Sequence, residues 1–151
     1  MLRSQNRLRA LTGRGLLAFV VMLSGPINAP AQMPTLSGVT AHFHTNNDDK
    51  DDDTRLSVYV YAGPTLIARS ENNTGKYNNG SDHDINLNVL GIHDSGQLAH
   101  GSTKVMITPN GHDHWEFTYS FDLTWSDGNV TQFTCGSTAL SQDDRVYTCT
   151  W

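Results

Sequence analysis

The sequence predicts an all-β protein, a single antiparallel β-sandwich of about eight strands that covers residues 35–151. The first observation is that residues 115–125 carry large apolar side chains at every odd position and polar ones at the even positions between them. Because successive side chains of a strand point to opposite faces, we expect one long strand with one buried face. The second is that shorter alternating stretches recur between turn residues, with no helical period, which is typical of an antiparallel sandwich.

The expected strands follow one another from residue 39 onward. In the first of them Val39, Ala41 and Phe43 share one face, and a similar alternation marks the others. We expect strands over residues 39–44, 56–61, 65–69, 85–89, 105–107, 115–125, 130–135 and 147–151. The stretches between them, polar or marked by Gly and Pro, are expected to be turns or loops, at 46–53, 62–64, 71–83, 91–101, 109–113 and 136–144.

The turn after the long strand allows two registers. A two-residue loop at 127–128 would turn the polar Gln132 toward the aromatic face. A three-residue loop at 126–128, ending in a left-handed glycine, would turn Phe133 and Cys135 there instead. The second register buries more apolar surface, and we therefore prefer it.

The first 31 residues are expected to be a cleavable secretory signal peptide. Four arginines precede the apolar run 16–23, and small residues end the segment at Ala29-Pro30-Ala31, with cleavage expected after Ala31. A membrane anchor is the alternative, but eight apolar residues are too few for a bilayer that needs about 20. The sequence therefore predicts a secreted or periplasmic protein that is not an integral membrane protein.

Cys135 and Cys149 are the two cysteines of the chain, and both lie in the expected mature part. An even number of cysteines in an oxidising compartment favours a disulfide. Closing a loop of about 15 residues would stabilise the fold by roughly 3 kcal/mol. We expect this pair to be linked rather than to form a zinc site or a catalytic thiol.

The mature chain is strongly acidic. Removing residues 1–31 removes four of the ten basic residues and none of the acidic ones, which leaves 6 Lys and Arg against 15 Asp and Glu, a net charge of −9. Such a chain repels phosphate backbones, so we do not expect nucleic acid as a partner. A cation is a better candidate.

The carboxylates are concentrated at one predicted end of the sandwich. Loops that follow odd-numbered strands share one end, and these loops with their borders hold eleven of the fifteen Asp and Glu residues. A bound cation would relieve the repulsion among them, and Ca²⁺ takes about six to eight oxygen ligands in flexible loops. The predicted calcium ligands are Asn47, Asp48, Asp49, Asp51, Asp53 and Asp113. The other interpretation is a solvated acidic loop without a metal.

The acidic loop at residues 46–54, together with the eight-strand plan, resembles the C2 and PLAT-type β-sandwiches, which hold calcium at one end. The resemblance implies a non-catalytic domain that binds an extracellular polysaccharide, a lipid surface or a protein. The basic lipid-binding residues of C2 domains have no clear counterpart here, since Lys50 stands alone in the acidic run.

Four histidines support a different interpretation. His42 and His44 would share one strand face, and His112 and His114 form a second pair at the acidic end. Same-face histidine pairs suit zinc or copper, and copper–zinc superoxide dismutase is also an exported β-sandwich with a His-x-His strand. Strand histidines that face solvent without a metal are the commoner arrangement.

The sequence offers little for covalent or acid–base catalysis. It lacks a Gly-x-Ser-x-Gly elbow, and Glu116 and Asp122 would lie about 20 Å apart on one strand face, too far for a glycosidase pair. The leading hypothesis is therefore a secreted, non-catalytic, calcium-binding module that binds an extracellular ligand through its acidic end. The alternative is a small exported metalloenzyme with histidine-bound copper or zinc.

Overall fold

The computed structural model describes residues 32–151, and the predicted signal peptide lies outside the described residues. The described part is all-β, as the sequence predicts, with one short 3₁₀ helix. The elements are β1 (Leu36–Thr45), β2 (Arg55–Ala62), β3 (Thr65–Asn73), β4 (Asp82–Val89), η1 (Ser95–Leu98), β5 (Gly101–Thr108), β6 (His114–Trp125), β7 (Val130–Ser141) and β8 (Val146–Thr150). Within residues 32–151, no helix is long and apolar enough to cross a membrane.

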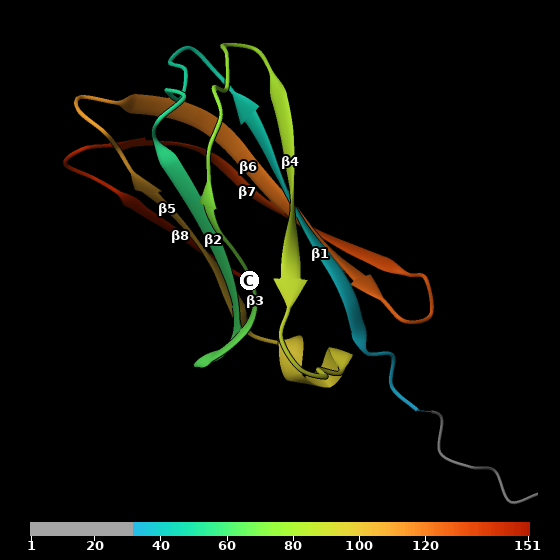
Figure 1. The fold of residues 1–151 in the computed structure, drawn as a ribbon. Coiled ribbons are helices and arrows are strands. Elements are labelled where there is room, and N and C mark those ends of the chain that lie inside the picture. The colour runs from blue at the N-terminus through green and yellow to red at the C-terminus, as the bar shows by residue number, and fades with distance from the viewer. Residues whose placement is uncertain (1–31) are drawn as a thin grey trace, which may run out of the picture. The chain divides into compact units, whose positions relative to one another are not determined.

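The eight strands form one antiparallel sheet in the order β7-β6-β1-β4-β3-β2-β5-β8. The sheet has two four-stranded halves, because β3 and β4 share a ladder of only Ala68–Val89 and Arg69–Asn88. The halves face each other across the core as in a sandwich (Figure 1). The barrel-like sheet is nearly closed on its other side, where the disulfide Cys135–Cys149 joins the edge strands β7 and β8. The predicted disulfide is confirmed.

The long aromatic strand is the centre of the core. All six odd-numbered side chains of β6, from Trp115 to Trp125, are buried, while the even-numbered ones lie on the outer face. Phe43 of β1 stacks on Tyr119 with ring centroids 4.9 Å apart. The buried Tyr119 hydroxyl is 2.7 Å from the Thr103 hydroxyl, so its polar atom is satisfied inside the core. Burying each such side chain stabilises the fold by about 1.5–3 kcal/mol.

The turn between β6 and β7 has the three-residue form that we prefer from the sequence. Trp125 N donates to Asn129 O at 2.8 Å, and Gly128 is left-handed with φ 85°. Phe121 therefore pairs with Phe133 across the two strands. A bulge at Gly136, with φ 84°, then reverses which face each later β7 side chain occupies.

Several strands are longer than their apolar alternation predicts. β3 continues to Asn73, β4 begins at Asp82, and β7 runs to Ser141 through a stretch expected to be a loop. Backbone hydrogen bonds to a neighbouring strand are sufficient to extend a ladder, whatever the side chains. In β7, moreover, the bulge moves the core-facing side chains from odd to even positions, so that Leu140 is buried. A search for one continuous alternation of period two therefore misses the second part of the strand.

Trp151, which follows β8, also helps to close the sheet. The indole nitrogen of Trp151 donates to Leu98 O at 3.1 Å, and the ring lies against Phe121 and Phe133 with centroids 5.0 and 4.9 Å away. Trp151 also exchanges backbone hydrogen bonds with Gly101. The C-terminal residue thus fills space between the two halves of the sheet.

Candidate functional site

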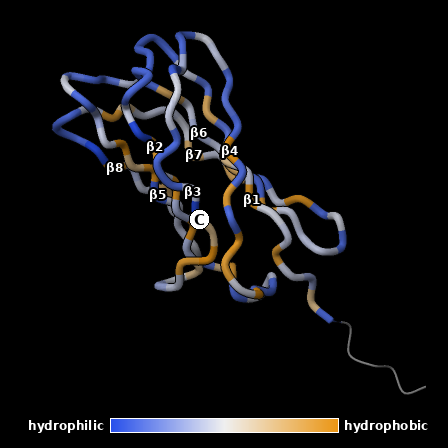
Figure 2. The backbone as a smooth tube through the Cα atoms, in the orientation of Figure 1, coloured by the Kyte–Doolittle hydropathy of each residue, from blue (hydrophilic) through white to orange (hydrophobic). Residues whose placement is uncertain are grey.

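The acidic end is formed by three loops that are held together by hydrogen bonds. The β1–β2 and β3–β4 loops meet in a small antiparallel bridge, in which Lys50 and Tyr77 exchange N–H to O bonds of 3.1 Å. Gly75 N donates to Asp52 O at 3.1 Å. The β5–β6 loop joins them through Asn110, whose side-chain amide donates to Asp53 at 2.8 Å. These loops are hydrophilic and lie at the opposite end from the β6–β7 turn (Figure 2).

Lys50 is the cation at the centre of the acidic loop. Its side chain is 0% exposed, and its Nζ atom donates to Thr54 O at 2.7 Å and to Asp51 O at 3.0 Å. The same atom lies 4.8 Å from the centroid of the buried Tyr77 ring. Burial lowers the pKa of Lys50, and the negative charge of nearby carboxylates, Asp113 foremost, partly offsets that shift. The loop therefore folds around its own ammonium group.

Four of the six predicted calcium ligands have side-chain partners. Asp49 forms an ion pair of 2.7 Å with Lys76, and Asp48 lies 3.0 Å from His114 Nδ1. The Asn47 amide donates to Glu116 at 3.4 Å. Asp53 accepts from Asn110, and Asp51 is exposed. Within residues 32–151, no three His, Cys, Asp or Glu side chains lie close enough together to hold a metal ion.

Among the six predicted calcium ligands, Asp113 is the one that is buried. Its side chain is 5% exposed, and one carboxylate oxygen accepts weakly from Asp51 N at 3.4 Å. The other oxygen has no hydrogen-bond partner, and neither does the buried Thr54 hydroxyl. Asp113 is therefore a buried carboxylate with one unpaired oxygen, and the Lys50 ammonium supplies positive charge nearby.

The four histidines of the alternative hypothesis occupy three separate places. His42 and His44 lie on the outer face of β1, as predicted, whereas His112 is exposed in the β5–β6 loop. His114 begins β6, four residues before Thr118, the β6 residue beside His44. That spacing corresponds to about 13 Å along the strand. The structure therefore does not bring the two pairs together.

His42 and His44 are instead each paired with carboxylates. His42 Nδ1 lies 2.7 Å from Asp84 and its Nε2 lies 3.3 Å from Asp122, while His44 Nδ1 lies 2.7 Å from Asp82. Burial lowers the pKa of His42, but Asp84 and then Asp122 outweigh it, so that the net pKa is raised above the ordinary 6.5. These side chains line a shallow groove of about 270 Å³ on the outer face.

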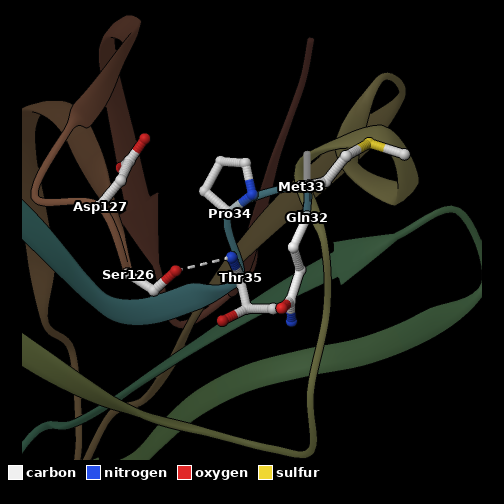
Figure 3. Close-up of a pocket in the computed structure, with 6 residues that line it drawn as sticks. All are labelled: Gln32, Met33, Pro34, Thr35, Ser126 and Asp127. Atoms are coloured by element: carbon white, nitrogen blue, oxygen red, sulfur yellow. Dashed lines mark hydrogen bonds between the residues drawn. The ribbon is translucent and has the colours of Figure 1, made fainter. Parts of the chain in front are cut away.

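A larger hollow lies at the opposite end from the acidic loops. It has a volume of about 460 Å³ and is lined by Gln32, Met33, Pro34, Thr35, Ser126 and Asp127 (Figure 3). Thr35 N donates to the Ser126 hydroxyl at 3.0 Å. Asp127 accepts from the backbone and side chain of Asn129 at 3.0 and 2.8 Å. Ser126 therefore joins the β6–β7 turn to the segment before β1, Asp127 holds the turn itself, and no histidine lines this hollow.

No protein-family model matches the chain, and no curated protein matches its sequence. The C2 or PLAT resemblance therefore stays a prediction from the strand plan and the acidic loop.

Sequence reasoning treated Lys50 as a lone cation in an acidic run and missed its structural role. A signal was present, because a single basic residue among five aspartates in six positions is well placed to neutralise them. The histidine–carboxylate pairs were missed for a different reason. They join residues about 40 positions apart, and the pairing of β1 with β4 was needed to bring them together.

Proposed function

We propose that this protein is an exported, non-catalytic β-sandwich module that binds an extracellular ligand. The observation that carries the proposal is the construction of the acidic end, where three loops are tied by backbone and side-chain hydrogen bonds around buried Lys50. Loops held in this way display a fixed surface, which is what a binding module needs. The disulfide adds support for an oxidising compartment, where such modules act.

Calcium binding at the acidic end is part of the proposal on grounds of charge alone. Five aspartates in six positions, with Asp113 beside them, create a local excess of negative charge around one lysine. Binding would require Asp48 and Asp49 to leave His114 and Lys76 and turn toward a common point. We therefore expect any calcium site to form by rearrangement of these side chains on the fixed loops rather than to be preformed.

A melting experiment tests the calcium component. An ion at 100 times its dissociation constant stabilises a fold by about 2.7 kcal/mol, so the melting temperature in millimolar calcium should exceed that in excess chelator by several degrees. Asp51→Asn with Asp53→Asn should remove most of this response. The matched control is Asp143→Asn with Asp144→Asn, which removes two exposed charges from the β7–β8 turn. Identical wild-type melting curves in calcium and chelator would mean a solvated acidic loop without a metal.

The outer-face histidines favour a second candidate, a metalloenzyme with histidine-bound copper or zinc. The Nδ1 atoms of His42 and His44 both face carboxylates, which is the orientation that metal-ligating histidines commonly have. Metal analysis of protein purified without chelator separates the two candidates. Stoichiometric copper or zinc, lost in His42→Gln, would favour the enzyme, whereas calcium or no metal would favour the module.

A further inference from the structure

The outer faces of the two halves of the sheet carry opposite charge. The strands β7, β6, β1 and β4 contain no Lys or Arg, and their outer faces carry Asp82, Asp84, Glu116 and Asp122. On the other half, the outer faces of β2, β3 and β5 carry Arg55, Arg69 and Lys104 against Glu71. In a mature chain of net charge −9, this is a local reversal of sign.

The same basic face carries two tyrosines. Tyr59 and Tyr61 lie two residues apart on β2, which places them on one face about 7 Å apart. Their inward neighbours Val58 and Val60 are fully buried, so the tyrosines belong to the outer side of the sheet. The β-ladders set Tyr59 directly between Arg69 of β3 and Lys104 of β5. We call these four residues, Tyr59, Tyr61, Arg69 and Lys104, the tyrosine face.

Polar contacts hold part of the tyrosine face in place. The Tyr59 hydroxyl donates to Glu71 at 3.0 Å, and Arg69 lies 3.5 Å from the same carboxylate. The Arg69 side chain is nevertheless 47% exposed, so it can form further hydrogen bonds. Lys104 takes part in no ion pair within residues 32–151. By contrast, Lys50 is buried and Lys76 is paired with Asp49.

We propose that the tyrosine face binds an acidic polysaccharide, with Tyr61 and Tyr59 packing against sugar rings and Lys104 and Arg69 holding their carboxylates. Aromatic rings offer a rigid apolar surface with a polar edge, to which the C–H face of a sugar ring is complementary. Guanidinium and ammonium groups form charge-assisted hydrogen bonds with carboxylates. This inference goes beyond the proposed function, because it assigns a ligand class to a face other than the acidic end.

Other anionic partners fit this face less well. Double-stranded DNA carries one negative charge per about 1.7 Å, and three cations on one face of a chain of net charge −9 are too few to neutralise so dense a backbone. A lipid surface calls for large apolar side chains that enter the acyl boundary. The large hydrophobic residues exposed within residues 32–151 are Met33, Ile92, Val130 and Val146, and none belongs to the tyrosine face.

Affinity electrophoresis through gels containing polygalacturonate tests this assignment, with chelator present so that calcium plays no part. We expect retardation of the wild type, and dissociation constants at least about tenfold weaker for Lys104→Glu. Tyr61→Leu keeps apolar volume but removes the ring, and should weaken binding about fivefold. The matched control is Lys76→Glu, which makes the same charge change outside the face. Near-ultraviolet circular dichroism of each variant establishes that it is folded.

Four outcomes would overturn this proposal. Equal weakening by Lys76→Glu and Lys104→Glu would mean a response to net charge rather than to this face, and would overturn the proposal. So would absence of retardation, binding of double-stranded DNA at equal strength, or sedimentation showing that the face binds a second copy of the chain. Asp51→Asn with Asp53→Asn should leave retardation unchanged, so failure here is distinct from failure of the calcium experiment.

Discussion

The Nζ atom of Lys50 lies 4.8 Å from the centroid of the Tyr77 ring, and the same ring stacks on His83 at 3.8 Å. Because Lys50 and Tyr77 also share the bridge between the β1–β2 and β3–β4 loops, these contacts fix one loop against the other. The positive charge of Lys50 adds to burial in lowering the pKa of His83. A cation inside the acidic end thus affects both the packing and the protonation of its neighbours.

Replacing Lys50 should therefore destabilise the fold. Lys50→Ala removes the hydrogen bonds to Asp51 O and Thr54 O and leaves a cavity, and we expect the free energy of unfolding to fall by about 3 kcal/mol. Lys76→Ala, at the exposed ion pair with Asp49, should cost less than about 1 kcal/mol. Urea denaturation of both variants measures the difference. Equal costs would mean that Lys50 is not a structural cation.

The contrast between Lys50 and the aromatic strand shows what the sequence can predict. The alternation of 115–125 indicates the strand and its buried face, because both depend on neighbouring side chains alone. Burial of Lys50 depends on Tyr77, which reaches it from another loop. The pairing of His42 with Asp84 and Asp122 likewise requires three adjacent strands. Long-range contacts of this kind leave no periodic signal in the sequence.

In the β7 strand, the sequence predicts the register correctly up to the bulge at Gly136 and not beyond it. The expected three-residue turn correctly places Phe133 toward the core. The sequence predicts a loop over residues 136–144, between the last two strands. In the structure Gly136 forms a bulge with φ 84°, and the strand continues with Leu140 buried. A glycine within an alternating stretch signals a bulge as well as a loop, and a single sequence does not distinguish them.

The disulfide between the edge strands should contribute substantially to stability. Cys135 and Cys149 are separated by 14 positions, and cross-linking a loop of this size stabilises by about 3 kcal/mol on the chain-entropy model. Replacing both residues by serine should lower the free energy of unfolding by that amount, measured by urea denaturation. A double variant as stable as the wild type would show that the edges are held without the bond.

The pH dependence should distinguish two neighbouring histidines. The pKa of His42 is raised, so its pairing stabilises the fold fully below its ordinary pKa of 6.5, and this contribution is lost as pH rises through the raised value. The pKa of His83 is lowered, so its burial destabilises the fold at low pH, and this cost disappears as pH rises from the lowered value to 6.5. Nuclear magnetic resonance titration should give His42 the higher pKa.

A stability measurement independently checks the direction of the His42 pKa shift. The difference in free energy of unfolding between the wild type and His42→Gln should be larger near pH 6 than near pH 8, because the variant lacks the protonated partner of Asp84 and Asp122. Taking the difference cancels the opposing contribution of His83. A difference that grows toward pH 8 would contradict the assignment.

The contact between Gly101 and Trp151 gives the most specific test of how the sheet is closed. A Cβ atom added to Gly101 would clash with Cζ2 of the Trp151 ring, so an alanine there must displace the indole. Gly101→Ala should therefore cost about 1–3 kcal/mol, and Trp151→Ala about 2–3 kcal/mol through lost packing on Phe121 and Phe133.

In the Trp151→Ala background the clash is absent, and adding Gly101→Ala should cost less than about 1 kcal/mol. A double-mutant cycle by urea denaturation measures this coupling. Strictly additive costs would show that Trp151 does not pack on Gly101 in solution.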